Sequence, residues 1–218
     1  MFSHENYDAF VDNLLTWYDD NGRHDLPWRE NDASPFEVLV AELMLQQTSV
    51  EQVQEVFEEF VEKFPDPESV VAVSEKEITE EIEPLGSQKR TKYFRKASHD
   101  IIEQHGGNVP DEQSELLDLH GVGEYTAASV LAHAHGKDAV AVDTNVARVL
   151  SRVFGLDAAD EPSAAENWDL AERSAPAGRC SDYLHALIDF GSAVCTASNP
   201  KCSDCPLADL CEYHEQGA

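Results

Sequence analysis

The stretch Leu117–Val130, LDLHGVGEYTAASV, places a Gly-x-Gly pair directly before an apolar pattern that opens a helix. Glycine adopts left-handed backbone conformations that other residues avoid, so this pair predicts a tight turn. A tight turn that leads into a helix N-terminus presents backbone amides to an anion. The stretch therefore predicts a backbone loop that holds a phosphate.

The overall charge argues against a polyanionic partner at first sight. The 218 residues include 43 acidic and 15 basic side chains, for a formal net charge of −28. Acids spread along the whole chain are typical of halophilic proteins, where the Debye length falls to about 3 Å at 1 M salt. Counterion release contributes little in such a medium, so the net charge does not exclude DNA.

One third of the basic residues fall within residues 89–96, a strong local concentration in this acidic chain. They are Lys89, Arg90, Lys92, Arg95 and Lys96. Two interpretations remain open from composition: a nucleic-acid-binding patch, or a solvated helix face.

Apolar residues make up 42% of the chain, enough for a hydrophobic core. No apolar run approaches the roughly 20 residues of a membrane span, and the N-terminus lacks the pattern of a secretory signal. We expect a cytoplasmic, monomeric protein with no membrane partner.

Apolar residues recur at helical spacing along the chain, and no segment alternates with a period of two. The fold class predicted is all-α. The expected helices begin near Tyr7, Pro35, Val53, Glu75, Lys89, Gln113, Tyr125, Asp143, Ala164 and Asp182.

Four of the five cysteines lie within 17 residues, as Cys195, Cys202, Cys205 and Cys211, with the spacing C-x6-C-x2-C-x5-C. Disulfides are disfavoured in the cytosol, so these thiols indicate metal ligands. A structural zinc site usually draws its ligands from two C-x(2–4)-C pairs, and this segment contains only one such pair. The spacing therefore favours a [4Fe–4S] cluster. The remaining Cys180 is expected to be a small buried residue.

Two carboxylates stand out by their surroundings. Glu42 is the one polar residue in Val38–Leu45. If it is buried, it either finds a partner or has its pKa raised by desolvation, as a general acid requires; the alternative is that it points to a solvent-exposed edge. Asp143 stands at a helix N-cap position, where backbone N–H groups keep a carboxylate ionised. Such a pair breaks glycosidic bonds in other proteins.

Together these segments resemble the helix-hairpin-helix (HhH-GPD) DNA glycosylases related to endonuclease III. LHGVGEYTA resembles the hairpin, GKDAVAVDTNVARV the Gly-rich loop with its essential Asp, and the four cysteines the cluster loop. The order and spacing also match, from Leu26 to Cys211.

The resemblance implies a six-helix barrel over residues 27–135 and a second lobe, built from residues 1–26 and 136–218, that carries the catalytic Asp and the cluster. Double-stranded DNA would lie across the cleft. The hairpin amides of Gly121, Val122 and Gly123 would bind a phosphate.

Tyr125 stands where the bifunctional lyases of this family carry a lysine. A tyrosine cannot form a Schiff base, so the resemblance implies a monofunctional hydrolase that leaves the strand intact. By similarity Asp143 stabilises the sugar cation or orients water, and Glu42 protonates the leaving base. Without the resemblance, the position of Tyr125 is also typical of an aromatic residue in the hydrophobic core.

The motif AELMLQQT resembles adenine glycosylases, in which the Gln-Gln-Thr segment, here Gln46, Gln47 and Thr48, wedges into the base stack. The base pocket expected from the resemblance comprises Leu26, Trp28, Arg29, Asn145 and His185. The segment LGSQKRTKYF and His185 depart from the adenine enzymes, whose C-terminal domain also has no counterpart here.

These departures resemble the short archaeal glycosylases that act on thymine or uracil opposite guanine. We therefore predict a base-excision-repair glycosylase for a mispaired base opposite guanine, with thymine or uracil favoured over adenine. The alternatives are a non-enzymatic DNA-binding module and a small electron carrier. The presence of both Glu42 and Asp143 argues against a module without catalysis. An electron carrier would not need the hairpin.

Overall fold

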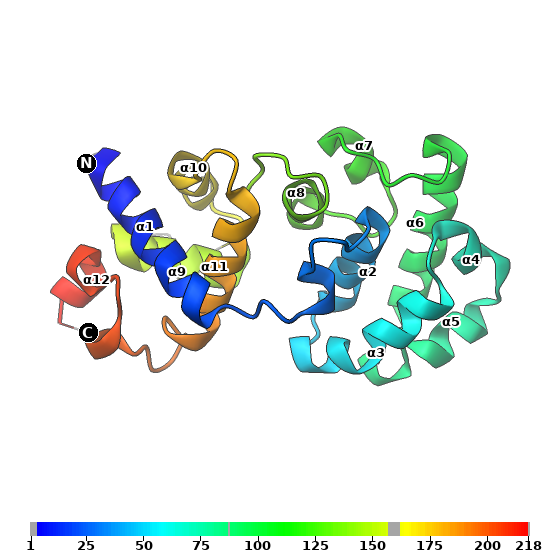
Figure 1. Ribbon diagram of the computed structural model, residues 1–218, viewed down its shortest axis with the longest axis horizontal. Helices are drawn as coiled ribbons and strands as arrows, with labels where there is room; N and C mark the ends of the chain where they lie inside the picture. Colours follow the sequence, from blue (N-terminus) through cyan, green and yellow to red (C-terminus); the bar gives the residue numbers. More distant parts are fainter. Residues whose placement is uncertain (1–3, 87, 157–161, 218) are drawn as a thin grey trace. The chain divides into compact units, whose positions relative to one another are not determined.

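The computed structural model describes residues 4–86, 88–156 and 162–217. Helices and their connections make up this whole part of the chain, and no β-strand occurs in it (Figure 1). The all-α prediction is confirmed. None of the described helices is both long enough and apolar enough to cross a bilayer.

The chain divides into two compact units. Unit 2 is continuous and contains residues 24–135, whereas unit 1 combines residues 1–23 with residues 136–218. Unit 1 is thus discontinuous in sequence, and its N-terminal helix packs against helices that follow unit 2 in the chain.

Unit 2 contains seven α-helices and two short 3-10 helices among its described residues. They are η1 (Pro27–Arg29), α2 (Pro35–Leu45), α3 (Val50–Lys63), α4 (Pro67–Ala72), α5 (Glu75–Glu81), η2 (Glu83–Leu85), α6 (Gln88–His105), α7 (Gln113–Asp118) and α8 (Glu124–His133). Capping boxes at Ser34, Asp66 and Ser74 begin α2, α4 and α5.

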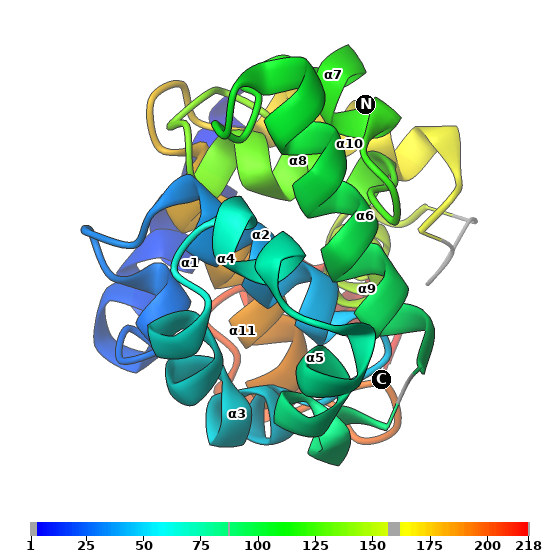
Figure 2. The ribbon, with the colours of Figure 1, turned by 90° about the vertical axis from the view of Figure 1, so that its right-hand side faces the viewer.

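The longest helix of unit 2, α6, is the centre of its packing. It lies against α4, α5 and α2 (Figure 2). Phe94 of α6 packs on Phe60 of α3 with ring centroids 5.0 Å apart, and Phe60 meets Phe64 at 4.9 Å. This aromatic core fixes which face of α6 is turned inward.

Unit 1 is built on α1 (His4–Asn21), α9 (Thr144–Phe154), α10 (Ala165–Ser174) and α11 (Cys180–Ala193). Helix α11 packs against both α1 and α9 (Figure 1). Phe10 of α1 meets Phe154 of α9 and Tyr183 of α11 in edge-on contacts. The chain then passes through η3 (Cys202–Asp204) and η4 (Ala208–Leu210) to α12 (Glu212–Glu215).

The sequence does not predict α4, because its six residues are too few to show a helical period. Its cap Asp66 accepts a hydrogen bond from the Ser69 amide at 2.8 Å, and Val70 is fully buried against neighbouring helices. Tertiary packing rather than local propensity therefore stabilises this short helix.

Candidate functional site

Glu42 lies in α2 with only 8% of its surface exposed. The hydroxyl of Ser129, on α8, donates a hydrogen bond to Glu42 Oε1 at 2.9 Å. Ser129 is itself 1% exposed, so the contact lies inside the packing of α2 on α8. Of the two interpretations of Glu42, the structure supports the buried and partnered one.

Tyr125, Ser129 and His133 follow one another at intervals of four residues on α8, so they share one helix face. Because Ser129 bonds to Glu42, this face is turned toward α2. Tyr125 is half-buried there rather than enclosed in the core. Burial, assisted by the positive charge of Arg29, lowers the pKa of His133 to about 3, so its imidazole is neutral at pH 7.

The glycine turn before α8 has the conformation that its sequence requires. Gly121 has φ +89°, and a Cβ atom on it would lie 2.6 Å from Cγ of Tyr93, so only glycine fits. Gly123 is the N-cap of α8, and no side chain caps that helix. Within the described residues the amides of Gly121 and Gly123 have no protein partner, which leaves them available to an anion.

The expectation that the amide of Val122 is available to bind a phosphate is wrong. That N–H donates to the carbonyl of Leu119 at 3.1 Å, which closes the turn. The amide donors of the hairpin are therefore the two glycines and the first turn of α8.

The Gln46–Thr48 loop follows α2 and contacts the hairpin directly. Gln46 Nε2 donates to the carbonyl of Gly121 at 3.0 Å. Gln47 has φ +58°, the one left-handed non-glycine residue in the described part of the chain. Such a conformation costs about 1–2 kcal/mol, so the surroundings must hold this loop in place.

Arg90 of α6 supplies that restraint, although the sequence places it in a basic cluster typical of a surface. It is 4% exposed and donates to the carbonyls of Leu43 at 3.2 Å and Gln46 at 2.7 Å, and to Thr48 Oγ1 at 2.6 Å. Burial lowers the pKa of its guanidinium. The interpretation of residues 89–96 as one solvated face is therefore wrong for Arg90.

Three residues of the expected base pocket belong to the segment that enters unit 2. Leu26 and Trp28 are 2% and 6% exposed, and Trp28 packs edge-on against Phe57 at 5.1 Å. Both therefore belong to the hydrophobic core of unit 2, and their expected place beside the base remains a prediction. Arg29 lies near His133 on the face of α8 described above.

Asp143 is the N-cap of α9, as its sequence position predicts. Its Oδ1 accepts a hydrogen bond from the amide of Val146 at 2.7 Å, and its Oδ2 accepts one from Asn145 Nδ2 at 2.9 Å. Both carboxylate oxygens are thus oriented by N–H donors. Asn145 contacts Asp143 directly, and its expected role beside the base remains a prediction.

Arg148 connects this carboxylate to the cysteine-rich segment. Its Nη2 donates to Asn145 Oδ1 at 2.7 Å and to the carbonyl of Gly191 at 2.8 Å, and its Nε donates to the carbonyl of Cys195 at 2.8 Å. Gly191 permits this approach, because a Cβ on it would lie 2.7 Å from Cβ of Asn145. Asp143, Asn145, Arg148 and Cys195 therefore form one hydrogen-bonded series within unit 1.

His185 lies on α11 of the same unit and is 9% exposed. One turn further along α11, Asp189 is 2% exposed and accepts hydrogen bonds from the Arg23 amide and Nε, both at 2.8 Å. This ion pair ties the end of the N-terminal segment to α11.

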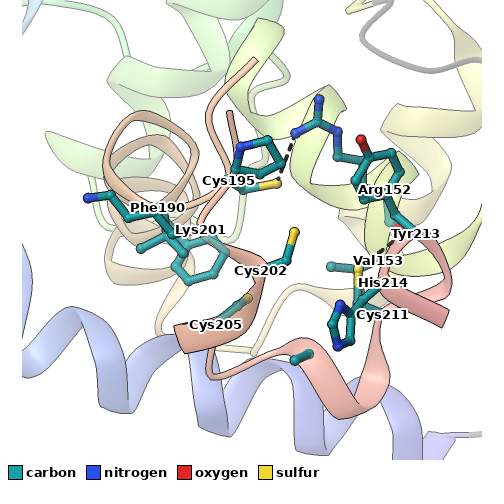
Figure 3. A pocket seen from close by; sticks show the side chains of 13 residues that line it. Arg152, Val153, Phe190, Cys195, Lys201, Cys202, Cys205, Cys211, Tyr213 and His214 are labelled. Carbon is teal, nitrogen blue, oxygen red and sulfur yellow. Dashed lines mark hydrogen bonds between the residues drawn. The ribbon is translucent and has the colours of Figure 1, made fainter. Parts of the chain in front are cut away.

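The four clustered cysteines line one pocket, which has about 360 Å³ of empty space, part of it open to solvent. Figure 3 shows Cys195, Cys202, Cys205 and Cys211 around this pocket. In the described part of the chain no three His, Cys, Asp or Glu side chains converge as a site for one metal ion. Thiols spaced around a cavity suit a polynuclear cluster, whose iron atoms are bound separately.

Arg152 of α9 holds one end of this segment. It contacts Cys195 Sγ at 3.6 Å (Figure 3) and also donates to the carbonyl of Thr196 at 2.8 Å. Burial raises the pKa of the free Cys195 and Cys211 thiols, and that of Cys205 to about 11. Thiolates at these positions therefore require a compensating positive charge, which an iron–sulfur core provides.

Comparison with known proteins gives the family. The model of the HhH-GPD superfamily, described as a base excision DNA repair protein, matches residues 40–173. The chain belongs to this superfamily. The iron-sulfur binding domain of endonuclease III matches residues 195–211 of the same HhH-GPD protein, from the first clustered cysteine to the last. This match confirms the predicted [4Fe–4S] cofactor.

Relatives match along almost the whole HhH-GPD chain. A thymine/uracil-DNA glycosylase of Methanothermobacter thermautotrophicus is 34% identical over 217 residues, covering 95% of this chain and 94% of that protein. An adenine DNA glycosylase of Rattus norvegicus is also 34% identical, but only 42% of its length is covered. These matches confirm the prediction of a DNA N-glycosylase.

The fold comparison agrees. The structure of a thermostable thymine-DNA glycosylase superposes with a TM-score of 0.91 at 33% identity, covering 97% of this chain and 98% of that one. Endonuclease III in a non-covalent DNA complex superposes with a TM-score of 0.85 at 28% identity, covering 99% of this chain and 98% of that one. The predicted endonuclease III-like fold is therefore confirmed.

Sequence reasoning missed three residues that support the site: Ser129, Arg90 and Arg148. Ser129 and Arg148 are polar residues within apolar helical stretches, the same pattern that singled out Glu42. Arg90 carries no such signal, because basic neighbours surround it in the sequence.

Proposed function

We propose that this HhH-GPD protein is a monofunctional glycosylase that removes thymine or uracil mispaired with guanine in double-stranded DNA. The observation that carries the proposal is the pair of differently held carboxyl groups, Glu42 buried against Ser129 and Asp143 fixed between two N–H donors. We further propose that it acts as a cytoplasmic monomer.

Glu42 is assigned the role of proton donor to the departing base. A carboxyl group enclosed by α2 and α8 with a hydroxyl partner is shielded from bulk water and is held in position to give a proton to a leaving group. Ser129 orients the carboxyl through the 2.9 Å hydrogen bond.

Asp143 is assigned to the sugar. With its oxygens fixed by the Val146 amide and the Asn145 side chain, it can stabilise positive charge that develops on the sugar ring or orient the attacking water.

Tyr125 supports hydrolysis without strand scission. It occupies the first turn of α8, on the face that Ser129 turns toward Glu42. A phenol provides no amine for a Schiff base, so borohydride is expected to trap no covalent adduct with DNA.

The cluster ligands proposed are Cys195, Cys202, Cys205 and Cys211. Bound there, a [4Fe–4S] core supplies structural cross-linking of the segment, since four protein ligands leave no iron position open. Purified protein is expected to be brown, with about four irons per chain. Colourless protein with one zinc would refute this assignment.

The preference for thymine or uracil rests on His185 and on the likeness to a thymine/uracil-DNA glycosylase, which is 34% identical over 217 residues. His185 also stands where adenine enzymes carry Glu or Gln. An adenine glycosylase acting opposite guanine or its oxidised form is the second candidate, favoured by the Gln46–Thr48 segment.

Duplexes with single G:T, G:U, G:A and oxidised-G:A pairs, cleaved with alkali after incubation, test the proposal. Product from G:T and G:U alone supports it, and product from the adenine duplexes alone supports the second candidate. The absence of product on all four, from cluster-loaded protein and across a range of salt concentrations, would refute the enzyme assignment.

A further inference from the structure

The first half of α6 has two chemically distinct faces. Arg90, Phe94 and Ala97 are buried, whereas Lys89, Lys92 and Lys96 are exposed. Spacings of three and four residues put these three lysines on one side of the helix. We refer to Lys89, Lys92 and Lys96 as the lysine face.

The lysine face is not neutralised by the acidic surface of the chain. Among the described residues, none of its three ammonium groups has a carboxylate within 4 Å, although acidic residues outnumber basic ones 43 to 15. Two other lysines do pair: Lys63 with Glu81, and Lys76 with Glu80 at 3.3 Å. Three adjacent unpaired cations in so acidic a chain indicate a binding surface for a negatively charged partner.

The lysine face adjoins the hairpin. Tyr93, which lies between Lys92 and Lys96 in the sequence, packs on Gly121 and contacts His120 with ring centroids 5.8 Å apart. Further along α6, Asp100 accepts a hydrogen bond from the His120 amide at 3.2 Å. The free amides of the hairpin and the three ammonium groups therefore belong to one continuous part of unit 2.

We propose that the lysine face binds consecutive phosphates of the DNA strand that the hairpin holds. The inference rests on the proposed function in one respect, that DNA is the partner. Ammonium groups act as point charges on phosphates without reading bases, so the contribution is to affinity and not to the choice of base. The carboxylates of Asp100 and Glu103 limit the surface to the first half of α6.

Salt dependence of DNA binding provides the test. Each phosphate contact that is lost lowers the slope of log K against log salt by about 0.9. We expect K92Q/K96Q to lower the slope by about 1.8 and K89Q/K92Q/K96Q by about 2.7 on an undamaged duplex. The variants should fold as the parent does, because all three side chains are exposed.

The matched control is K63Q/K76Q, which changes the net charge as much as K92Q/K96Q but removes lysines already paired with acids. Its slope should equal that of the parent. The proposal would be overturned if the lysine-face variants kept the slope of the parent, or if K63Q/K76Q lowered the slope as much as K92Q/K96Q does.

The two proposals fail separately. A lowered slope with no base release from any mismatch keeps the lysine face and removes the enzyme assignment. Base release from a mismatch, together with unchanged salt slopes in the lysine-face variants, supports the enzyme assignment and refutes the lysine face. Binding of an acidic protein segment with no effect on DNA slopes would likewise contradict the lysine face.

Discussion

The regions around Glu42 and Asp143 give the same functional group two different settings. Glu42 is held between two packed helices by a hydroxyl, and its neighbours along α2 are apolar. Asp143 is held at a helix terminus by amide donors, and through Asn145 and Arg148 it connects to the cysteine-rich segment. We assign proton donation to the enclosed carboxyl group and stabilisation of positive charge to the carboxylate whose two oxygens are oriented by N–H donors.

The largest effect is expected from Asp143→Asn. The amide removes the charge that would face the sugar cation, so single-turnover base release should fall by about 10³-fold or more. DNA affinity, measured by titration at one stated salt concentration, should stay within a few-fold of the parent. Retained turnover would show that Asp143 acts only as a helix cap.

Glu42→Gln should lower base release by about 10²-fold to 10³-fold, because the amide cannot donate a proton to the leaving base. Ser129→Ala keeps the carboxyl group, so it should lower the rate of base release less than Glu42→Gln does. Single-turnover base release from a mismatched duplex measures both variants. A rate in Glu42→Gln equal to that of the parent would assign the proton to another group.

Arg148→Met tests the connection between Asp143 and the cysteine-rich segment. It leaves the carbonyls of Gly191 and Cys195 without their donor, which should cost about 3 kcal/mol of unfolding free energy and loosen cluster binding. Denaturant unfolding and visible absorbance measure the two effects. Arg173→Met, in an exposed pair with Asp169, is the matched control and should change stability by less than about 0.5 kcal/mol.

The last prediction concerns pH and unit 2 alone. The pKa of His133 is about 3 in the folded protein, below its ordinary value of 6.5. The unfolded chain therefore binds more protons below pH 6.5, and stability that is complete above that pH is lost as pH falls toward 3. The loss is at most about 1.4 kcal/mol per pH unit.

His133→Gln cannot titrate and should flatten this part of the stability curve, measured by denaturant unfolding between pH 4 and pH 7. A parallel curve for the variant would show that other groups cause the acid sensitivity.

The positions of the turns, caps and cysteines were predictable because each depends on neighbours in the sequence. The Gly121 turn, the Asp143 cap and the C-x6-C-x2-C-x5-C segment all have local causes, and the structure contains each of them. The one local error is the Val122 amide, which closes the turn instead of facing outward.

The amino-acid sequence by itself determined the helical class, the glycine turn, the capping Asp143 and the grouping of four cysteines in one segment, since these follow from short-range spacing. Only the tertiary structure decided that Arg90 faces inward while Lys89, Lys92 and Lys96 face outward, and that Ser129 meets Glu42. Helical periodicity states which residues share a face, but what lies opposite that face is set by packing between segments distant in the chain.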